Sequence, residues 1–326
     1  MKGILRLSII ACSLLVSKNS FPLQMGVNVH PNQFPGTTND IVEILNTNHI
    51  KSFRTDYSWG QLEKKPGVFS PQDDKINDLI NKSRSAGLKP LLILDYGNSI
   101  YNIERPITTD EVNKYVQYVS WVVNHFKGKV YAYEIWNEWI HRDNLNDKEE
   151  SYQSASNYYS LVKAVSTVIR QHDPSVKIIA GGYNPTDPKA REWGDMIVDK
   201  GILNYIDGIS IHPYDYSSPD KTNKIETFSI IDKQYNQWKN KTGKVTKIYI
   251  TEFGYSTYDG KFHYTEQQVK DTLSLYFAEA KKYSYIDGIW YYELIDKSRN
   301  RNDIESNYGL LNSSESPKVQ MKSFLQ

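Results

Sequence analysis

Residues 130–138 read VYAYEIWNE, an apolar and ring-rich run of strand length that ends in an amide and a carboxylate. Seven more apolar runs lie along the chain, separated by turns and by longer segments with helical apolar spacing. Their starts leave about 37 residues for each unit, which suits one strand, one helix and two loops. The eight runs are 25–30 (MGVNVH), 50–56 (IKSFRTD), 89–96 (KPLLILDY), 130–138, 176–182 (VKIIAGG), 207–214 (DGISIHPY), 247–256 (KIYITEFGYS) and 286–294 (IDGIWYYEL).

This alternation predicts an α/β fold. Near-continuous apolar strands separated by helices indicate an all-parallel sheet covered on both faces, and eight strands can close into a barrel. We therefore expect a single (β/α)8 TIM barrel, one catalytic domain over residues 21–326. A doubly wound open sheet is the alternative fold, but no glycine-rich phosphate loop follows the first run, and Gly181-Gly182 is too short to be one.

Residues 1–20 resemble a secretory signal peptide. Lys2 and Arg6 precede a short apolar run at 7–16, and polar residues follow. The run is far shorter than the roughly 20 apolar residues of a membrane-spanning helix, and no later stretch comes close. We expect a secreted or periplasmic protein whose mature part has no cysteine, because Cys12 lies in the leader. A lipoprotein acylated at Cys12 is the alternative, although the apolar run before it is very short.

The charge balance argues against a nucleic-acid-binding protein. The chain has 39 Lys and Arg against 38 Asp and Glu, a formal net charge of +1, with no basic block to follow a phosphate backbone. Hydrophobic residues make up 39%, enough for a substantial core. The unusual feature is aromatic content, since 25 Tyr, 10 Phe and 7 Trp predict a ring-rich core or a ring-lined cleft.

Polar side chains stand at the ends of most runs, where (β/α)8 barrels place their catalytic groups. Two of them, Glu138 and Glu252, are glutamates that would face one cavity. Displacement at the anomeric carbon of a sugar needs such a pair, because one carboxyl donates a proton and the other attacks. The residues at the run ends are Asn28 and His30, Arg54 and Asp56, Asp95, Asn137 and Glu138, His212 and Tyr214, Glu252, and Trp290.

Segments 135–138 (IWNE) and 251–255 (TEFGY) resemble the acid/base and nucleophile strands of clan A glycoside hydrolases. Within that clan the chain resembles family 39 and related bacterial polysaccharide hydrolases, with family 5 as the nearest competitor. The motifs behind this are 59–63 (WGQLE), 66–69 (PGVF), 91–98 (LLILDYGN), 133–138 (YEIWNE) and 309–311 (GLL). The usual Asn-Glu-Pro is here Asn137-Glu138-Trp139, which puts the leaving-group side of the cleft in question.

The resemblance implies a retaining glycoside hydrolase that cleaves O-glycosidic bonds, β-linked, in a polysaccharide or oligosaccharide by double displacement. Glu138 would be the acid/base and Glu252 the nucleophile, and the charge of Glu252 would keep Glu138 protonated. Retention requires carboxyls about 5 to 5.5 Å apart. This chemistry needs no cofactor and no metal, and the sequence indicates no obligate protein partner.

Other residues are expected to bind substrate or to hold the catalytic pair. Arg54 would donate charge-assisted hydrogen bonds to Glu252, and Asn137 would bond the sugar 2-hydroxyl. The phenol of Tyr214 would bond the nucleophile, and Trp290 would form the floor of the subsite for the cleaved sugar. The full set is Arg54, Asn137, His212, Tyr214, Trp290 and His30.

Glu134 has the strand parity of Glu138 but lies about 13 Å deeper in the predicted barrel. We interpret it as a structural residue, with Arg54 as its buried partner. Arg54 would then serve two roles, or only that one.

Two other functions remain open. A metal-dependent barrel hydrolase could gather His30, Asp56, His212 and Glu252 around one ion, although the first run lacks two histidines on one face and no carboxylate cluster stands out. A barrel that binds a glycan without cleaving it is the other alternative.

The sequence leaves the sugar and the linkage open, and both endo and exo action fit the resemblance. A net charge near zero favours neutral over strongly anionic glycans. We favour internal cleavage of a bacterial polysaccharide.

Overall fold

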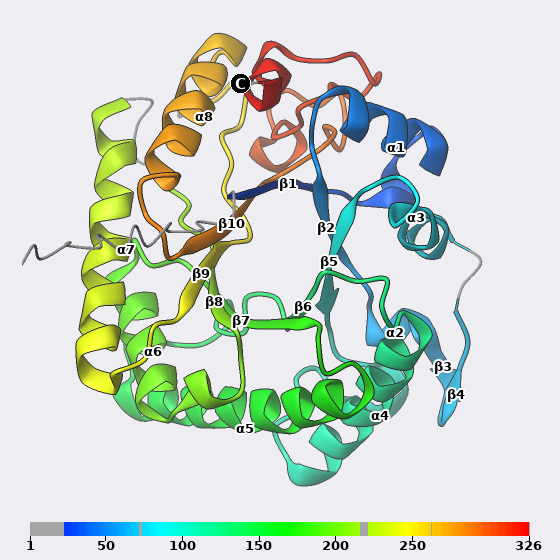
Figure 1. Cartoon of the computed structure of the whole chain (residues 1–326), viewed down its shortest axis with the longest axis vertical. Coiled ribbons are helices and arrows are strands. Elements are labelled where there is room, and N and C mark those ends of the chain that lie inside the picture. Colours follow the sequence, from blue (N-terminus) through cyan, green and yellow to red (C-terminus); the bar gives the residue numbers. More distant parts are fainter. Residues whose placement is uncertain (1–22, 72–73, 216–220, 262, 326) are drawn as a thin grey trace, which may run out of the picture.

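Eight parallel strands close into a barrel in the computed structural model, which describes residues 23–71, 74–215, 221–261 and 263–325 (Figure 1). Around the barrel the strands follow the order β1-β10-β9-β8-β7-β6-β5-β2, and β2 pairs with β1. All eight predicted runs form barrel strands, so the (β/α)8 prediction is confirmed. The strands are β1 (Gln24–Asn28), β2 (Ser52–Asp56), β5 (Lys89–Leu94), β6 (Ala132–Ile135), β7 (Lys177–Tyr183), β8 (Gly208–Ile211), β9 (Lys247–Ile250) and β10 (Ile286–Tyr291).

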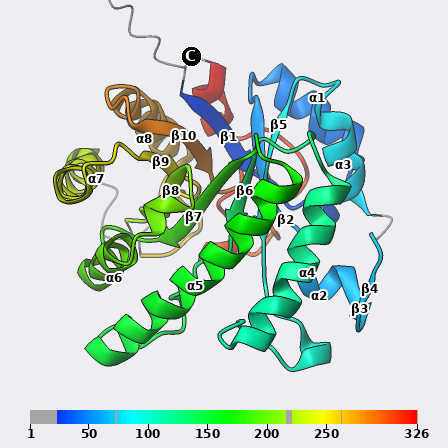
Figure 2. The same cartoon turned by 60° about the horizontal axis from the view of Figure 1, so that its bottom comes forward.

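Helices surround the barrel, and α4 and α5 pack side by side on its outer face (Figure 2). Capping boxes set where several of them begin, as at α4, where the Thr108 side chain accepts from the Glu111 amide and the Glu111 side chain accepts from the Thr108 amide. Their apolar faces pack onto the outward side chains of the strands. The helices are α1 (Thr38–Thr47), α2 (Trp59–Leu62), α3 (Lys75–Ser83), α4 (Thr109–His125), α5 (Lys148–His172), α6 (Pro188–Asp199), α7 (Lys221–Thr242) and α8 (Glu266–Ala280).

The WGQLE and PGVF motifs form α2 and a small hairpin of β3 (Glu63–Lys65) and β4 (Val68–Phe69). Glu63 organises this unit, because its carboxylate accepts from the indole of Trp59 at 2.6 Å and from the amide of Gly67 at 2.6 Å. Gly67 has φ +73°, a conformation that favours glycine. These motifs therefore shape a loop beside the barrel mouth, and Trp59 is fully buried.

Trp290 is not a subsite floor, so that expectation is wrong. Its side chain is fully buried inside the barrel, packed among Leu91, Ile93, Ala132, Ile179 and Tyr249. The indole donates to the hydroxyl of Ser52 at 3.0 Å. Glycines on two strands make room for the ring, since a Cβ at Gly26 would lie 2.3 Å from it and a Cβ at Gly288 would lie 2.4 Å from it. Trp290 belongs to the packed interior layers that fill such barrels below the mouth.

The predicted signal peptide at 1–20, with Cys12, lies outside the described residues. Within the part of the chain that the structure describes, no helix is long and apolar enough to cross a membrane. The described residues after position 22 form the one barrel with its loops and a C-terminal 3-10 helix, Val319–Leu325.

Candidate active site

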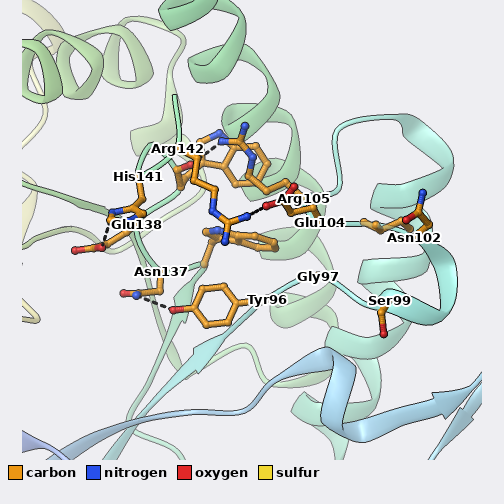
Figure 3. A pocket seen from close by; sticks show the side chains of 13 residues that line it. Tyr96, Gly97, Ser99, Asn102, Glu104, Arg105, Asn137, Glu138, His141 and Arg142 are labelled. Atoms are coloured by element: carbon orange, nitrogen blue, oxygen red, sulfur yellow. Dashed lines mark hydrogen bonds and ion pairs between the residues drawn. The ribbon is translucent and has the colours of Figure 1, made fainter. Parts of the chain in front are cut away.

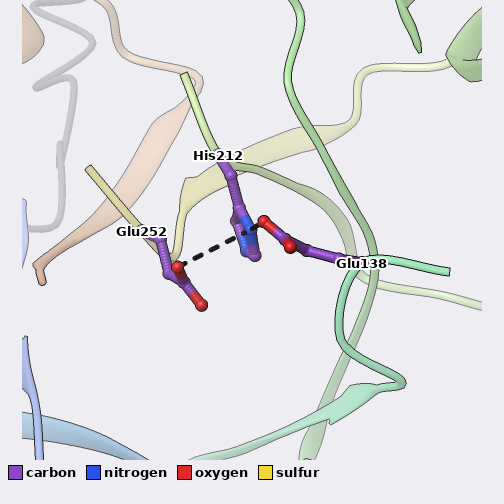
Figure 4. Close-up of side chains that lie close together, drawn as sticks. All are labelled: Glu138, His212 and Glu252. Carbon is purple, nitrogen blue, oxygen red and sulfur yellow. Dashed lines mark hydrogen bonds and ion pairs between the residues drawn. The ribbon is translucent and has the colours of Figure 1, made fainter. Parts of the chain in front are cut away.

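Glu138 and Glu252 meet at the carboxyl end of the barrel, as the strand-end pattern predicts. Glu138 lies three residues past β6 and Glu252 two residues past β9, and His212 follows β8 between them (Figure 4). One oxygen of each carboxylate and one ring nitrogen of His212 lie within 4.8 Å of one another. This separation matches the short spacing of retaining glycosidases, about 5 to 5.5 Å, and leaves no room for the water that inverting enzymes place between their carboxyls.

The turn after β6 aims Glu138 across the mouth. Both Trp136, with φ +65°, and Glu138, with φ +47°, adopt the left-handed conformation that non-glycine residues rarely take. Gly182 at the end of β7 gives this turn space, because a Cβ there would lie 3.1 Å from the Glu138 amide nitrogen. Each left-handed residue lowers the folding stability by about 1–2 kcal/mol. This strain lies in the turn that directs Glu138 toward His212.

Arg54 binds four polar side chains of the site. Its guanidinium is only 2% exposed and donates to Glu134 Oε2 at 2.7 Å and to Glu252 Oε1 at 2.6 Å. It also donates to the amide oxygens of Asn28 and Asn137, both at 2.8 Å. Arg54 therefore has both roles considered from the sequence: it balances the structural carboxylate Glu134 and holds Glu252. Removing it would leave two buried carboxylates without their counter-charge.

Both carboxylate oxygens of Glu252 accept hydrogen bonds. Oε1 accepts from Arg54, and Oε2 accepts from the hydroxyl of Tyr214 at 2.9 Å. The side chain is nearly buried but lines the cleft. Glu252 is thus fixed as an oriented carboxylate, the state that a nucleophile needs.

Glu138 shares a proton with His212. The hydroxyl of Thr251 donates to Glu134 at 2.9 Å, so its oxygen must accept from His212 Nε2 at 3.0 Å. The other ring nitrogen, Nδ1, lies 2.9 Å from Glu138 Oε1. One proton occupies that second bond, and it belongs either to the imidazole or to the carboxyl.

The charges around His212 and Glu138 shift the pKa of both groups. Burial would lower the pKa of His212, but the carboxylates of Glu252 and Glu138 outweigh it and raise the pKa. Burial would raise the pKa of Glu138, but the hydrogen bond and charge of His212, with the charge of His141, lower it. The negative charge of Glu252 thus stabilises the proton that the coupled His212–Glu138 pair shares beside the leaving-group position.

His30 lies in a row of titratable side chains on the opposite arc of the mouth. Its Nδ1 is 3.4 Å from Asp56 Oδ2 and its Nε2 is 3.3 Å from Glu293 Oε2. Burial raises the pKa of Asp95 well above its usual range, as does the neighbouring Asp56 carboxylate. Burial would raise the pKa of Asp56 too, but its bonds to His30 and to Asp95 lower it to about 2. The pKa values of Asp56 and Asp95 are therefore shifted in opposite directions.

Glu293, in the same row of side chains, makes the stability of the protein depend on pH. Burial raises the pKa of Glu293 to about 7, and its Oε1 has no hydrogen-bond partner among the described residues. A carboxyl with a raised folded pKa binds its proton more tightly in the folded state, so stability falls as pH rises from about 4.5 to 7. Glu293→Gln should therefore gain about 3 kcal/mol of unfolding free energy relative to the wild type between pH 4.5 and pH 8.

Urea unfolding of both proteins at the two pH values measures this gain. Glu43→Gln is the matched control, because Glu43 is an exposed glutamate on α1 and is not among the charges that shift the pKa of Glu293. A stability difference between Glu293→Gln and the wild type that stays the same at both pH values would contradict the assignment.

The cleft around the nucleophile is a hollow of about 530 Å³. It contains the predicted residues His30, Arg54, Asn137, Tyr214 and Glu252. Tyr292 and Tyr308 also line it, and the sequence reasoning missed both. Tyr292 has the strand parity of Trp290 but stands two residues further along, past the end of β10, where side chains reach the mouth. Its position past the predicted end of the strand is the sequence signal that would have identified Tyr292. The choice of Trp290 because of its indole ring missed this signal.

A metal ion held by the four residues named from the sequence does not fit this geometry. Within the described residues, the cluster with metal-ligand spacing is Glu138, His212 and Glu252, and His30 and Asp56 are not part of it. In that cluster Glu138 and His212 already bond each other, and the guanidinium of Arg54 lies 2.6 Å from Glu252. A fixed cation at that distance opposes the binding of a second one.

Comparison with known proteins shows that the chain is similar to carbohydrate-active enzymes. The model of the cellulase family, glycosyl hydrolase family 5, matches residues 16–292. The chain is similar to endo-1,4-beta-xylanase A of Thermotoga maritima, with 27% identity over 181 residues, 52% of this chain and 16% of the xylanase. It is also similar to a beta-1,4-xylanase of Dictyoglomus thermophilum, with 29% identity over 115 residues, 32% of this chain and 31% of that enzyme. The chain thus spans less than a third of the length of either xylanase in these matches.

Solved structures show the same fold. A family 39 glycoside hydrolase from Bacteroides cellulosilyticus WH2 superposes with a TM-score of 0.76 at 21% identity, covering 94% of this chain and 63% of that one. Xylanase B of Clostridium stercorarium F9 superposes with a TM-score of 0.68 at 15% identity, covering 93% and 96%. The sequence model thus matches family 5, the competitor named from the sequence, and a family 39 enzyme shares the fold.

Proposed function

The chain belongs to the cellulase family, glycosyl hydrolase family 5, and from that membership we propose that it is a retaining glycosidase. It cleaves O-glycosidic bonds, β-linked, in a polysaccharide or oligosaccharide, with Glu138 as acid/base and Glu252 as nucleophile. The observation that carries this proposal is the carboxyl pair at the barrel mouth, whose oxygens lie within 4.8 Å.

In the first step Glu252 attacks the anomeric carbon while the leaving oxygen takes a proton. Arg54 and Tyr214 hold the two carboxylate oxygens and orient the attacking one. The bond from the anomeric carbon to the leaving oxygen breaks, its electron pair stays on that oxygen, and a covalent glycosyl ester forms at Glu252.

The proton moves because the charge at Glu252 disappears in this step. The Glu252 carboxylate raises the pKa of His212, so its conversion into an ester weakens the hold of the imidazole on its Nδ1 proton. Glu138 lies 2.9 Å from that nitrogen and passes the proton to the leaving oxygen. Formation of the ester and donation of the proton are thus coupled through one histidine.

In the second step Glu138 is the base. It takes a proton from a water that attacks the anomeric carbon from the side that the leaving group has vacated. Glu252 then leaves as a carboxylate, and its charge draws the proton back to His212. Two displacements at one carbon restore the original anomeric configuration.

The names of the similar xylanases make a β-1,4-linked xylan the first substrate to test. Release of reducing ends should be measured on xylan, β-glucans, mannan and bacterial exopolysaccharides, with Glu252→Ala as the matched control. Release by the wild type alone supports the proposal and gives the glycan. Silence on the whole panel would contradict it and favour the binding barrel that does not cleave.

We also propose that residues 1–20 direct export, because they have the charge and apolar pattern of a signal peptide. Expression of the full chain in a bacterium should place a shortened protein outside the cytoplasm, with a mass that lacks the leader. Retention of the full-length chain in the cytoplasmic fraction would contradict this.

A further inference from the structure

The ring of Tyr308 lines the hollow that contains Glu252. A second hollow, of about 780 Å³, also reaches Glu138, but its lining does not include this ring (Figure 3). Tyr308 packs edge to face on Tyr214, with the ring centroids 6.3 Å apart, and on Tyr292, with the centroids 5.7 Å apart. Because the hydroxyl of Tyr214 donates to Glu252, the position of Tyr308 bears on the nucleophile through one intervening ring.

Two charged side chains bind the main chain on either side of Tyr308. The carbonyl of Asn307, the residue before it, accepts from Lys318 Nζ at 3.4 Å. The amide of Gly309, the residue after it, donates to Asp296 Oδ1 at 2.8 Å. Lys318 Nζ and Asp296 Oδ1 lie 2.7 Å apart, and the two side chains are 3% and 5% exposed. One buried ion pair thus binds both peptide groups that flank the ring.

The ammonium of Lys318 also reaches the segment that follows the nucleophile. Its third hydrogen bond goes to the hydroxyl of Thr257 at 3.0 Å. Thr257 lies five residues after Glu252, and its amide and hydroxyl both donate to the Asn307 carbonyl, at 3.0 and 3.2 Å. Lys318 therefore joins the C-terminal segment to the segment that carries Glu252 and to the loop after β10.

The pair contributes fixed geometry more than stability. Burial lowers the pKa of Lys318 and raises the pKa of Asp296, and the attraction between the two charges offsets this only in part. A buried ion pair of this kind adds little net stability compared with packed apolar side chains of similar size. Its hydrogen bonds are directional, however, so they define where the peptide groups around Tyr308 lie.

We propose that Lys318 is a positioning residue of the glycosidase. With Asp296 it sets the ring of Tyr308 against Tyr214, and through Tyr214 it affects the orientation of the Glu252 carboxylate. Lys318 does not line the hollow, so it acts through Tyr308 and not on the substrate. This inference rests on the proposed glycosidase function.

Other hydrogen bonds keep this loop folded when Lys318 is changed. The hydroxyl of Tyr291 donates to the Tyr308 carbonyl at 2.9 Å. The side-chain amide of Gln320 donates to the Gly309 carbonyl at 3.0 Å. We therefore expect a substitution of Lys318 to move the ring of Tyr308 without releasing the loop.

Lys318→Met removes the ammonium and keeps an unbranched side chain. On the glycan that the wild type cleaves in the panel, kcat/KM should fall about tenfold or more. KM should rise because Tyr308 lines the hollow, and kcat should fall because Tyr214 orients the nucleophile. The double variant Lys318→Met/Asp296→Asn leaves no unpaired buried charge, and it should show the same loss while urea unfolding confirms that it is folded.

The matched control is Lys322→Met, since Lys322 is an exposed lysine on the same 3-10 helix, Val319–Leu325. It should leave both kcat and KM unchanged. A double-mutant cycle with Tyr308→Ala tests the path of the effect. If Lys318 acts through Tyr308, adding Lys318→Met to Tyr308→Ala should lower kcat/KM by less than about twofold more.

Three results would overturn the inference and leave the glycosidase proposal standing. They are full activity of the folded Lys318→Met/Asp296→Asn variant, a loss in Lys318→Met with KM unchanged, and losses that multiply in the cycle with Tyr308→Ala. A loss confined to kcat would mean only fewer active molecules. Failure of the wild type to cleave any glycan of the panel would overturn both the glycosidase proposal and this inference.

Discussion

Replacing Glu252 with alanine should lower kcat by on the order of 10⁵-fold, with the folded structure retained. Glu252 accepts hydrogen bonds from both Arg54 and Tyr214, so the alanine removes the carboxylate that these two residues orient for attack on the anomeric carbon. The space left by the side chain admits a small anion. Azide should therefore restore turnover, and because it attacks directly from the face that Glu252 occupied, the product should be the glycosyl azide of inverted configuration.

The control for this variant is Glu43→Ala, which removes an exposed glutamate from α1 and should leave kcat unchanged. Circular dichroism and urea unfolding check that Glu252→Ala is folded. Residual activity of about one per cent or more in the absence of azide is far above a 10⁵-fold loss, and it would show that another group is the nucleophile.

Replacing Glu138 with alanine should produce a loss that depends on the leaving group. On a substrate with a sugar or phenol leaving group, kcat/KM should fall by about 10²- to 10⁴-fold, because the departing oxygen lacks its proton donor. On a 2,4-dinitrophenyl glycoside, whose leaving group departs without a proton, kcat/KM should change little. Azide should here yield the glycosyl azide of retained configuration, because the ester at Glu252 still forms first.

A ratio of kcat/KM between the two substrates that stays at the wild-type value would contradict the acid/base role of Glu138. It would also contradict the proposed proton path from His212, because that path runs through the Glu138 carboxyl. The Glu43→Ala control applies here as well.

The fold was predictable because eight apolar runs, each followed by helical spacing, admit few topologies. The catalytic pair was predictable for a related reason: strand ends converge on one rim, so Glu138 and Glu252, which are 114 positions apart in the sequence, had to meet there. The structural role of Glu134 followed from its depth in the barrel alone. Arg54 binds both Glu134 and Glu252 because a guanidinium has several N–H donors that point in different directions.

The predictions that failed concern details finer than the positions of the strands. Trp290 and Tyr292 have the same strand parity, and only the observed end of β10 at Tyr291 decides which ring fills the barrel and which reaches the cleft. The shared proton depends on a 2.9 Å contact between two side chains that follow β6 and β8, and on the hydroxyl of Thr251, which makes His212 Nε2 a donor. Such distances emerge only when strands are placed side by side.

Trp139 illustrates both situations. The sequence marks Trp139 as a departure on the leaving-group side but cannot tell what the change builds. In the fold the larger ring packs inward on Trp136 and Tyr158, and the loop that carries Arg105 closes over it. The substituted residue therefore lines the hollow of about 780 Å³ beside Glu138.

The anomeric configuration of the first product tests the central claim most directly. Proton NMR of a rapid hydrolysis, recorded before mutarotation, separates the two anomers. The close carboxyl pair predicts that the β-anomer appears first from a β-linked substrate and equilibrates later. Initial appearance of the α-anomer would mean a single inverting displacement and would contradict the roles given to Glu138 and Glu252.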